Sequence, residues 1–199
     1  MRVMRASLRA IDNARAAILS VAAVYILSVA IGIGMASLGN AYALDRRDAI
    51  VGSAQSGDTL VAYRSGDRLR AALLDFAANL GLGGLTSTAL GISVVGAYPV
   101  FAYRGWVGGI VSVDAQHRSR LASSDTALYY LVTLVLQLIP YSIAGGVGVR
   151  LGIGAWRDMR GSSRASVLGL RTDLLRDAAL AYVVIAPLFL VASLWEFLM

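Results

Sequence analysis

The stretch that decides the fold is Ala16 to Leu38, AAILSVAAVYILSVAIGIGMASL, which contains no charged side chain. About 20 residues of α-helix, rising about 1.5 Å each, cross the roughly 30 Å hydrocarbon core of a bilayer. This run therefore predicts a membrane-spanning helix. Other apolar runs follow at Phe76 to Val113, with Arg104 as the single charge inside, at Thr126 to Val149 and at Ala178 to Trp195. Lipid rather than water is predicted to be the main solvent of the chain.

Composition limits the chemistry available to this chain. With 199 residues, of which 57% are hydrophobic, it is expected to form a single integral membrane domain, 1–199. It contains no cysteine and no lysine, and His117 is the single histidine. Thiolate nucleophiles, disulfides, lysine Schiff bases and histidine-rich metal or haem sites are thereby excluded within the chain. We expect no cofactor, no bound metal and no catalytic residues, so the chain is not predicted to be an enzyme.

The apolar pattern predicts an all-α, polytopic membrane helix bundle of about five transmembrane helices. The predicted spans are 16–38, 72–94, 97–113, 126–149 and 178–198. The second and third spans form a broken pair, because glycine relaxes the backbone and proline ends a helix at Gly96 to Pro99.

Two connecting segments have their own character. From Ser163 to Asp177, Val167, Leu170 and Leu174 recur at helical spacing, which predicts a helix lying in the cytoplasmic interface. The stretch from Gly39 to Arg70 is too polar to span a membrane. It is expected to be either a surface for a partner or a flexible connector.

Arginine placement predicts the orientation in the membrane. The formal net charge is +6, and all the basic residues that flank the spans are arginines. Arginines are denser before the first span and between the fourth and fifth spans than on the other side. The positive-inside rule then places the N-terminus in the cytoplasm and the C-terminus outside. Topology and anionic lipid headgroups account for this charge, and no nucleic-acid partner is expected.

Five polar side chains fall inside or at the edges of the predicted spans. They are Asp75, Asn79, Arg104, Gln137 and Glu196. Ionisable groups in a membrane are costly and need a partner, a water-filled cavity or a place near the surface. One hypothesis is that these residues form an inward-facing cluster that holds the bundle together. The alternative is that the carboxylates of Asp75 and Glu196 reach the membrane surface.

Glycines in the third and fourth spans are candidates for close helix contacts. Gly105 and Gly109 lie four residues apart, and Gly145 and Gly148 lie three apart. Small residues at such spacing let helix backbones approach. The contact is expected within the chain, with self-association into a homo-oligomer as the alternative.

The order of four pieces resembles the stage II sporulation protein M family of multi-pass membrane proteins. The pieces are the glycine-rich segment that follows Asp75-Phe-Ala-Ala-Asn79, Tyr103-Arg-Gly-Trp-Val-Gly-Gly109, Pro140 to Gly152 and Ser193-Leu-Trp-Glu-Phe197. Two positions depart from the family pattern: Arg104 stands where the family has asparagine, and Gln137 stands nearest its glutamate. The resemblance implies a prokaryotic inner-membrane location and a scaffolding role. It also implies protein partners such as wall-modifying enzymes or an ABC-type transporter.

Two functions follow as hypotheses. The first is a non-catalytic scaffold or accessory subunit of a larger cell-envelope complex, which needs packing surfaces and contact with lipids. The second is a small transporter or channel component with a polar path near Asp75, Asn79 and Arg104. They differ in whether these side chains line one water-accessible cavity or pair in a dry core.

Overall fold

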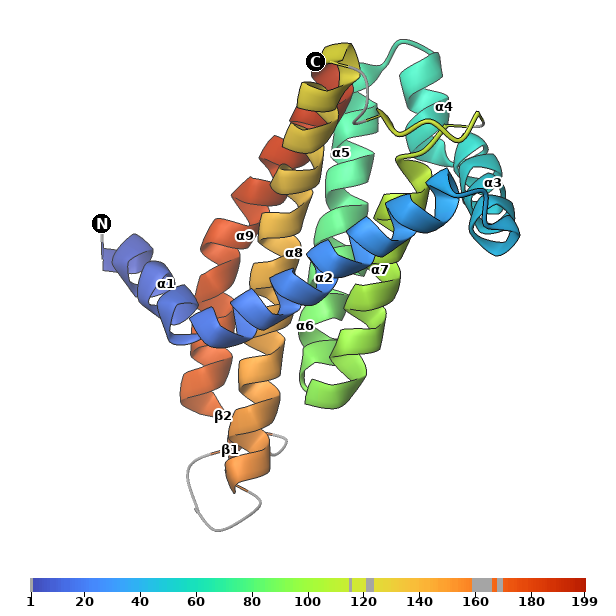
Figure 1. Ribbon diagram of the computed structural model, residues 1–199. Helices are drawn as coiled ribbons and strands as arrows, with labels where there is room; N and C mark the ends of the chain where they lie inside the picture. Colours follow the sequence, from blue (N-terminus) through green and yellow to red (C-terminus); the bar gives the residue numbers. More distant parts are fainter. Residues whose placement is uncertain (1, 115, 121–123, 159–165, 168–169) are drawn as a thin grey trace.

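The computed structural model describes residues 2–114, 116–120, 124–158, 166–167 and 170–199 (Figure 1). These residues are helical apart from turns and one short strand pair, as the sequence predicts. The α-helices are α1 Arg2–Asn13, α2 Arg15–Ser37, α3 Ala41–Gln55, α4 Asp58–Arg64, α5 Arg68–Ala78, α6 Thr86–Gly91, α7 Ala97–Val111, α8 Ser124–Asp158 and α9 Thr172–Leu198. The other elements are a π-helical segment η1 Asn79–Leu85, a 3-10 turn η2 Val94–Gly96, and the strands β1 Ser166–Val167 and β2 Leu170–Arg171.

Three helices are long and apolar enough to cross a membrane. They are α2, the part of α8 from Ala127 to Asp158, and α9. They cover the predicted spans 16–38, 126–149 and 178–198. The predicted spans 72–94 and 97–113 correspond to the helical run α5–η1–α6 and to α7, whose separate pieces are shorter.

The break between the second and third predicted spans lies where the sequence places it. Helix α6 ends at Gly91, η2 follows, and α7 begins at Ala97. Pro99 falls in the first turn of α7, where its missing N–H leaves no intrahelical hydrogen bond unmade. The chain can therefore reverse direction here in a few residues.

The predicted interfacial helix over 163–177 is wrong in its first part. Ser166–Val167 and Leu170–Arg171 pair as antiparallel strands, while 163–165 and 168–169 lie outside the described residues. The part from Thr172 onward is helical, but it is the first turns of α9, with Asp173 favourably placed near the helix N-terminus. Leu174, one of the residues that indicated a separate helix, instead packs from α9 against Gly154 of α8.

The helices form one bundle that α2 crosses obliquely (Figure 1). The run from α5 to α6 and the helices α7, α8 and α9 lie roughly along a common direction, and α2 crosses them obliquely. Helix α2 packs against both α7 and α8, and α8 packs along α9. Helix α1 extends to one side and packs against α9, where Ser7 and Ala10 are buried.

Close approaches between the helices occur at glycines. At Gly32, Gly105 and Gly109 an added Cβ would overlap backbone oxygen atoms of the facing helix, so α2 and α7 meet backbone to backbone. An added Cβ at Gly91 would lie 2.7 Å from the backbone of Gly148, which joins α6 to α8 in the same way. Such contacts matter in lipid, where dispersion and close packing replace the hydrophobic effect between helices.

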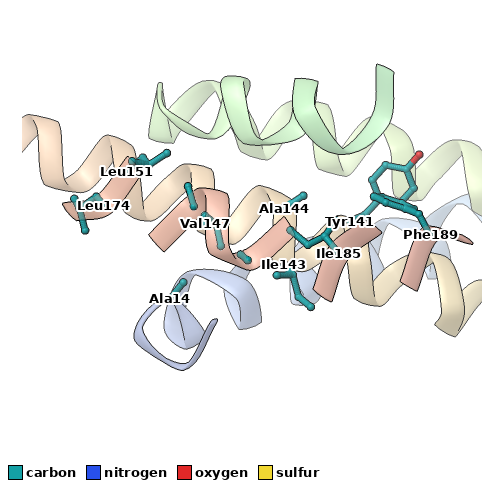
Figure 2. Packing of buried hydrophobic residues seen from close by; sticks show 11 residues of the cluster. Ala14, Tyr141, Ile143, Ala144, Val147, Leu151, Leu174, Ile185 and Phe189 are labelled. Carbon is teal, nitrogen blue, oxygen red and sulfur yellow. The ribbon is translucent and has the colours of Figure 1, made fainter. Parts of the chain in front are cut away.

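A larger apolar contact joins α8 to α9. Figure 2 shows Ile143, Ala144 and Val147 of α8 facing Ile185 and other residues of α9. At one end of this contact the rings of Tyr141 and Phe189 meet edge to face, with their centroids 4.9 Å apart. This aromatic pair marks the boundary between the apolar core and the polar site described below.

The segment 39–70 is folded into α3 and α4. Asn40 caps α3 by accepting a hydrogen bond from the backbone N–H of Ala43 at 3.1 Å. Arg47 of α3 is buried and donates to the main-chain oxygens of Val113 and Asp114, just after α7. The hypothesis of a flexible connector therefore does not describe this segment, which is docked on the end of α7.

Candidate functional site

A chain of hydrogen bonds links α5, η1, α8 and α9. The carboxylate oxygen Oδ2 of Asp75 accepts from Asn79 Nδ2 at 2.8 Å and from Ser193 Oγ at 2.7 Å. The hydroxyl of Tyr141 donates to Asn79 Oδ1 at 2.6 Å. Asp75 and Asn79 are four residues apart and therefore lie on one helical face. The arrangement joins α9 to Asp75 directly and α8 to it through Asn79.

The π-helical segment makes room for this network. Its sequence, NLGLGGL, begins with Asn79 and contains three glycines. A Cβ at Gly83 would lie 2.8 Å from Cε1 of Tyr141, and one at Gly84 would lie 2.9 Å from Cε2 of Phe189. The absence of side chains at these positions allows the Tyr141 and Phe189 rings to pack directly on the backbone. A π-helical turn within an α-helix is frequently found at functional sites.

A second polar contact joins α8 to the end of α9. Gln137 Nε2 donates to Glu196 Oε2 at 2.8 Å, and the Tyr129 hydroxyl donates to the main-chain oxygen of Glu196 at 2.9 Å. Trp195 stacks on Tyr129 with the centroids 5.8 Å apart. The Glu196 side chain is thus held by an amide between two helices.

Arg104 contacts the network through an aromatic ring. Its guanidinium carbon lies 5.0 Å from the centroid of the Tyr141 ring, and Nη2 donates to the main-chain oxygen of Leu82 at 3.2 Å. Within the described part of the chain, no ion pair joins Arg104 to a carboxylate. A cation–π contact of this kind stabilises the charge without neutralising it.

A cavity of about 300 Å³ opens beside Arg104. Residues of α2, α7 and α8 line it: Tyr25, Tyr103, Arg104, Val107, Gly108, Val111, Gln137 and Tyr141. Gln137 and Tyr141 thus border both the cavity and the hydrogen-bonded network. The polar groups of the site are therefore divided between packed contacts and an open space.

The five residues predicted as a cluster come together in two groups. Asp75 lies with Asn79, and Gln137 lies with Glu196, while Arg104 reaches the first group through Tyr141. Their functional role stays a prediction.

Sequence analysis missed Tyr25, Tyr141 and Ser193 as members of the site. The Pro140-Tyr-Ser sequence offered a signal for Tyr141, since a hydroxyl in an apolar span needs a partner. Ser193 looks like other small residues of α9, and its role depends on which face meets α5.

The predicted packing glycines lie at helix contacts. Gly105 and Gly109 face α2, and an added Cβ at Gly148 would overlap the backbone of Thr88 in α6. An added Cβ at Gly145 would overlap the ring of Phe101 from α7. All four glycines are thus used within the chain, which leaves self-association as an untested alternative.

The functional groups of the site are hydrogen-bond donors, hydrogen-bond acceptors and one cation, Arg104. These groups limit what the site can bind. Among the residues that the structure describes, no group of three or more histidine, cysteine, aspartate or glutamate side chains could hold a metal ion. The carboxylates of Asp75 and Glu196 are each occupied by neutral donors. Such an arrangement can join helices or recognise a polar group that enters the cavity.

The fold and the site together define a helical protein with three helices that can span a membrane and a polar site between them. No family model matches the chain, and no curated protein or solved structure matches it.

Proposed function

We propose that this chain is a non-catalytic multi-pass protein of the prokaryotic inner membrane, acting as a scaffold or accessory subunit of a larger cell-envelope complex. One observation carries the proposal: the carboxylate of Asp75 in α5 is bonded to α9 by Ser193, and the carboxylate of Glu196 in α9 is bonded to α8 by Gln137. Polar groups used in this way fix helix positions, as a framework for partners requires.

The proposal includes five membrane crossings, with the N-terminus inside and the C-terminus outside. Figure 1 supports it, because α2, the run α5–α6, α7, α8 and α9 alternate in direction along the bundle. The run α5–η1–α6 is an unbroken helical path from Arg68 to Gly91, long enough to cross the hydrocarbon core. Arginine distribution supports the same orientation.

Single-cysteine labelling tests this topology, because the natural sequence contains no cysteine. A membrane-impermeant maleimide should label Ser56→Cys and Met199→Cys in intact cells. It should label Arg5→Cys and Arg157→Cys only after the membrane is permeabilised. Equal labelling of Ser56→Cys and Arg5→Cys in intact cells would exclude the proposed orientation.

Membership of the stage II sporulation protein M family belongs to the same proposal. The motif order around Asp75, Tyr103, Pro140 and Ser193 supports it. The family then suggests wall-modifying enzymes or an ABC-type transporter as partners. The folded segment α3–α4 provides an exposed surface for such a partner.

Isolation of the tagged protein from its native membrane in mild detergent tests the scaffold function. Mass spectrometry should identify a membrane or wall-modifying protein at a fixed ratio to the chain. Reciprocal isolation through a tag on that protein should return the same ratio. Recovery of this chain alone, or as a homo-oligomer alone, would contradict the scaffold function.

The cavity beside Arg104 favours a second candidate, a small transporter or channel component. Purified protein in liposomes, loaded with a panel of small anions and cations, would test it. Flux that wild type supports and Arg104→Gln abolishes would favour transport. Wild-type liposomes as tight as protein-free liposomes would leave the scaffold function as the better proposal.

A further inference from the structure

Helix α1 carries a face of exposed arginines. Its buried residues, Ser7 and Ala10, lie on the side that packs against α9. Arg2, Arg5 and Arg9 recur every three or four residues, so they share another face, and all three are exposed. Among the described residues, no carboxylate forms an ion pair with these three arginines. The protein therefore leaves three positive charges of α1 open to its surroundings.

A second exposed face of α1 is apolar. Met4 and Leu8 lie four residues apart and are 49% and 54% exposed. Around the helix axis they lie between the buried face and the arginine face. Helices that lie in a membrane interface have this pattern, because their apolar side chains enter the acyl boundary while their basic side chains stay among the headgroups.

Helix α1 ends at a polar junction that it shares with α8 and α9. Asp177 of α9 accepts a long hydrogen bond from Asn13 Nδ2 at 3.5 Å and a shorter one from Arg150 Nη1 of α8 at 2.9 Å. Three charge-free runs begin or end within three residues of this junction: 16–38, 126–149 and 178–195. A level at which three apolar runs end together is expected to coincide with one surface of the membrane.

Helix α1 does not continue the line of α2 from this junction. Ala14 alone separates the two helices. Figure 1 shows that the chain bends sharply there, so that α1 extends to one side of the bundle. A helix joined to a membrane span by one residue stays near the bilayer surface. The exposed side chains of α1 are therefore close to lipid headgroups.

We propose that α1 is an interfacial helix that binds the anionic phospholipid headgroups of the cytoplasmic leaflet. The arginine face contacts the phosphates of several lipids, while Met4 and Leu8 enter the adjoining acyl region. This inference rests on the proposed membrane location and orientation, which single-cysteine labelling tests separately, and it does not depend on the scaffold function.

The two exposed faces of α1 favour a lipid surface over an acidic protein. An acidic segment of a partner would pair with Arg2, Arg5 and Arg9, but it would leave Met4 and Leu8 in water. An anionic leaflet offers negative charge and an apolar layer side by side, which matches the order of the two faces around α1. Neither a buried cavity nor a specific headgroup shape is needed.

Lipid-specific quenching of the full-length protein tests the proposal. The natural sequence has no cysteine, so Leu8→Cys can be labelled with bimane at one position. The labelled protein is placed in phosphatidylcholine nanodiscs that contain the same fraction of either brominated phosphatidylglycerol or brominated phosphatidylcholine. One arginine near an anionic surface strengthens binding about fivefold, so three should give a preference for phosphatidylglycerol of at least about tenfold. A bimane at Ser56→Cys, in the turn between α3 and α4, is the control and should show no preference.

Two sets of substitutions separate charge from structure. Replacing Arg2, Arg5 and Arg9 together by glutamine should abolish the preference, whereas replacing them together by lysine should keep most of it, because lysine retains the charge. All three side chains are exposed, so neither set disturbs the packing of α1 on α9. Equal quenching by the two lipids in the wild-type background, or a preference that survives the glutamine set, would overturn the proposal. Aqueous acrylamide that reaches the bimane at Leu8→Cys as freely as that at Ser56→Cys would overturn it in favour of a water-exposed helix open to an acidic protein.

Discussion

Helix α7 has two faces that meet their neighbours in opposite ways. Toward α2, Gly105 and Gly109 bring the two backbones into contact with no side chain between them. Toward α8, Arg104 and Val107 line a cavity of about 300 Å³. One contact across this second face is a hydrogen bond from the Tyr130 hydroxyl to the main-chain oxygen of Gly108, at 3.1 Å.

The difference shows how residue size sets helix spacing in lipid. Apolar side chains gain little by leaving lipid for another helix, so close approach depends on small residues. Where glycines align, as at Gly32 and Gly109, the helices touch. Where α7 presents Tyr103 and Arg104, the helices stand apart and polar groups occupy the separation. One helix thus serves as a structural element on one face and as a site wall on the other.

The largest predicted loss of stability comes from disrupting the close contact between α7 and α2. In Gly32→Val, the new Cβ would overlap the main-chain oxygen of Trp106, so α2 and α7 must separate. Overpacking of this kind costs about 3 kcal/mol. Reversible unfolding in mixed micelles of dodecyl maltoside and sodium dodecyl sulfate measures the loss of stability.

Gly34 provides the matched control for this prediction. It lies two residues away on α2, and nothing stands within 4 Å of an added Cβ. Gly34→Val should therefore unfold within about 0.5 kcal/mol of wild type. Equal destabilisation of the two variants would mean that helix propensity, rather than contact with α7, decides the outcome.

The second largest loss of stability is expected at Gln137 of α8, which borders the cavity beside α7. Gln137→Leu removes the amide that donates to Glu196 Oε2 and leaves the carboxylate without this donor. Loss of one partner of this partly buried hydrogen bond should cost about 2 kcal/mol. The same micelle unfolding measures it.

The double variant Gln137→Leu with Glu196→Leu sharpens the second prediction. Replacing both partners by apolar groups removes the stranded carboxylate, so the double variant should recover most of the lost stability. Additive losses from the two single variants would show that each residue acts through other contacts.

A smaller effect is expected from Tyr141→Phe. The ring stays in place against Phe189 and Arg104, while the hydrogen bond to Asn79 Oδ1 is lost. We expect a loss of about 1 kcal/mol in the free energy of unfolding. Tyr63→Phe is the control, since Tyr63 is exposed and its hydroxyl has no hydrogen-bond partner within the described ranges. A Tyr141→Phe variant as stable as Tyr63→Phe would contradict the importance of the bond.

The sequence predicts those elements that neighbouring residues determine by themselves. The run 16–38 forms α2 because its apolar length is sufficient, and the chain reverses before Pro99 because glycine and proline lie there. The approach of Asp75 to Asn79 follows from their spacing of four residues on a helix. These features need no knowledge of how the helices cross.

The positions of the other site residues and of α3 depend on contacts between segments that are distant in sequence. Tyr141 reaches Asn79 because its ring lies directly on the backbone of η1 at a glycine. Which of the glycines in η1 meets this ring depends on where α8 crosses η1. Ser193 faces Asp75 through the rotation of α9, which the charge-free run from Ala178 to Trp195 does not specify. The docking of α3 also depends on distant carbonyls that accept from Arg47.

The smallest effect is expected at the start of the connection from α7 to α8. The carboxylate of Asp114 accepts from the backbone N–H groups of Arg118 and Gln116 and from the Arg118 side chain. These bonds, chiefly that from the Arg118 backbone, lower the pKa of Asp114 below its ordinary value of 3.8. A lowered pKa stabilises the folded state above the ordinary value, and this contribution is lost as the pH falls through the folded pKa.

Asp114→Asn should therefore melt below wild type near neutral pH, and the difference in melting temperature should disappear once the pH is below the folded pKa of Asp114. The difference should be small, because water reaches and screens this half-exposed group. Asp45→Asn, an exposed aspartate of α3, should melt with wild type throughout. If the gap for Asp114→Asn persisted at low pH, the carboxylate charge would not hold the turn.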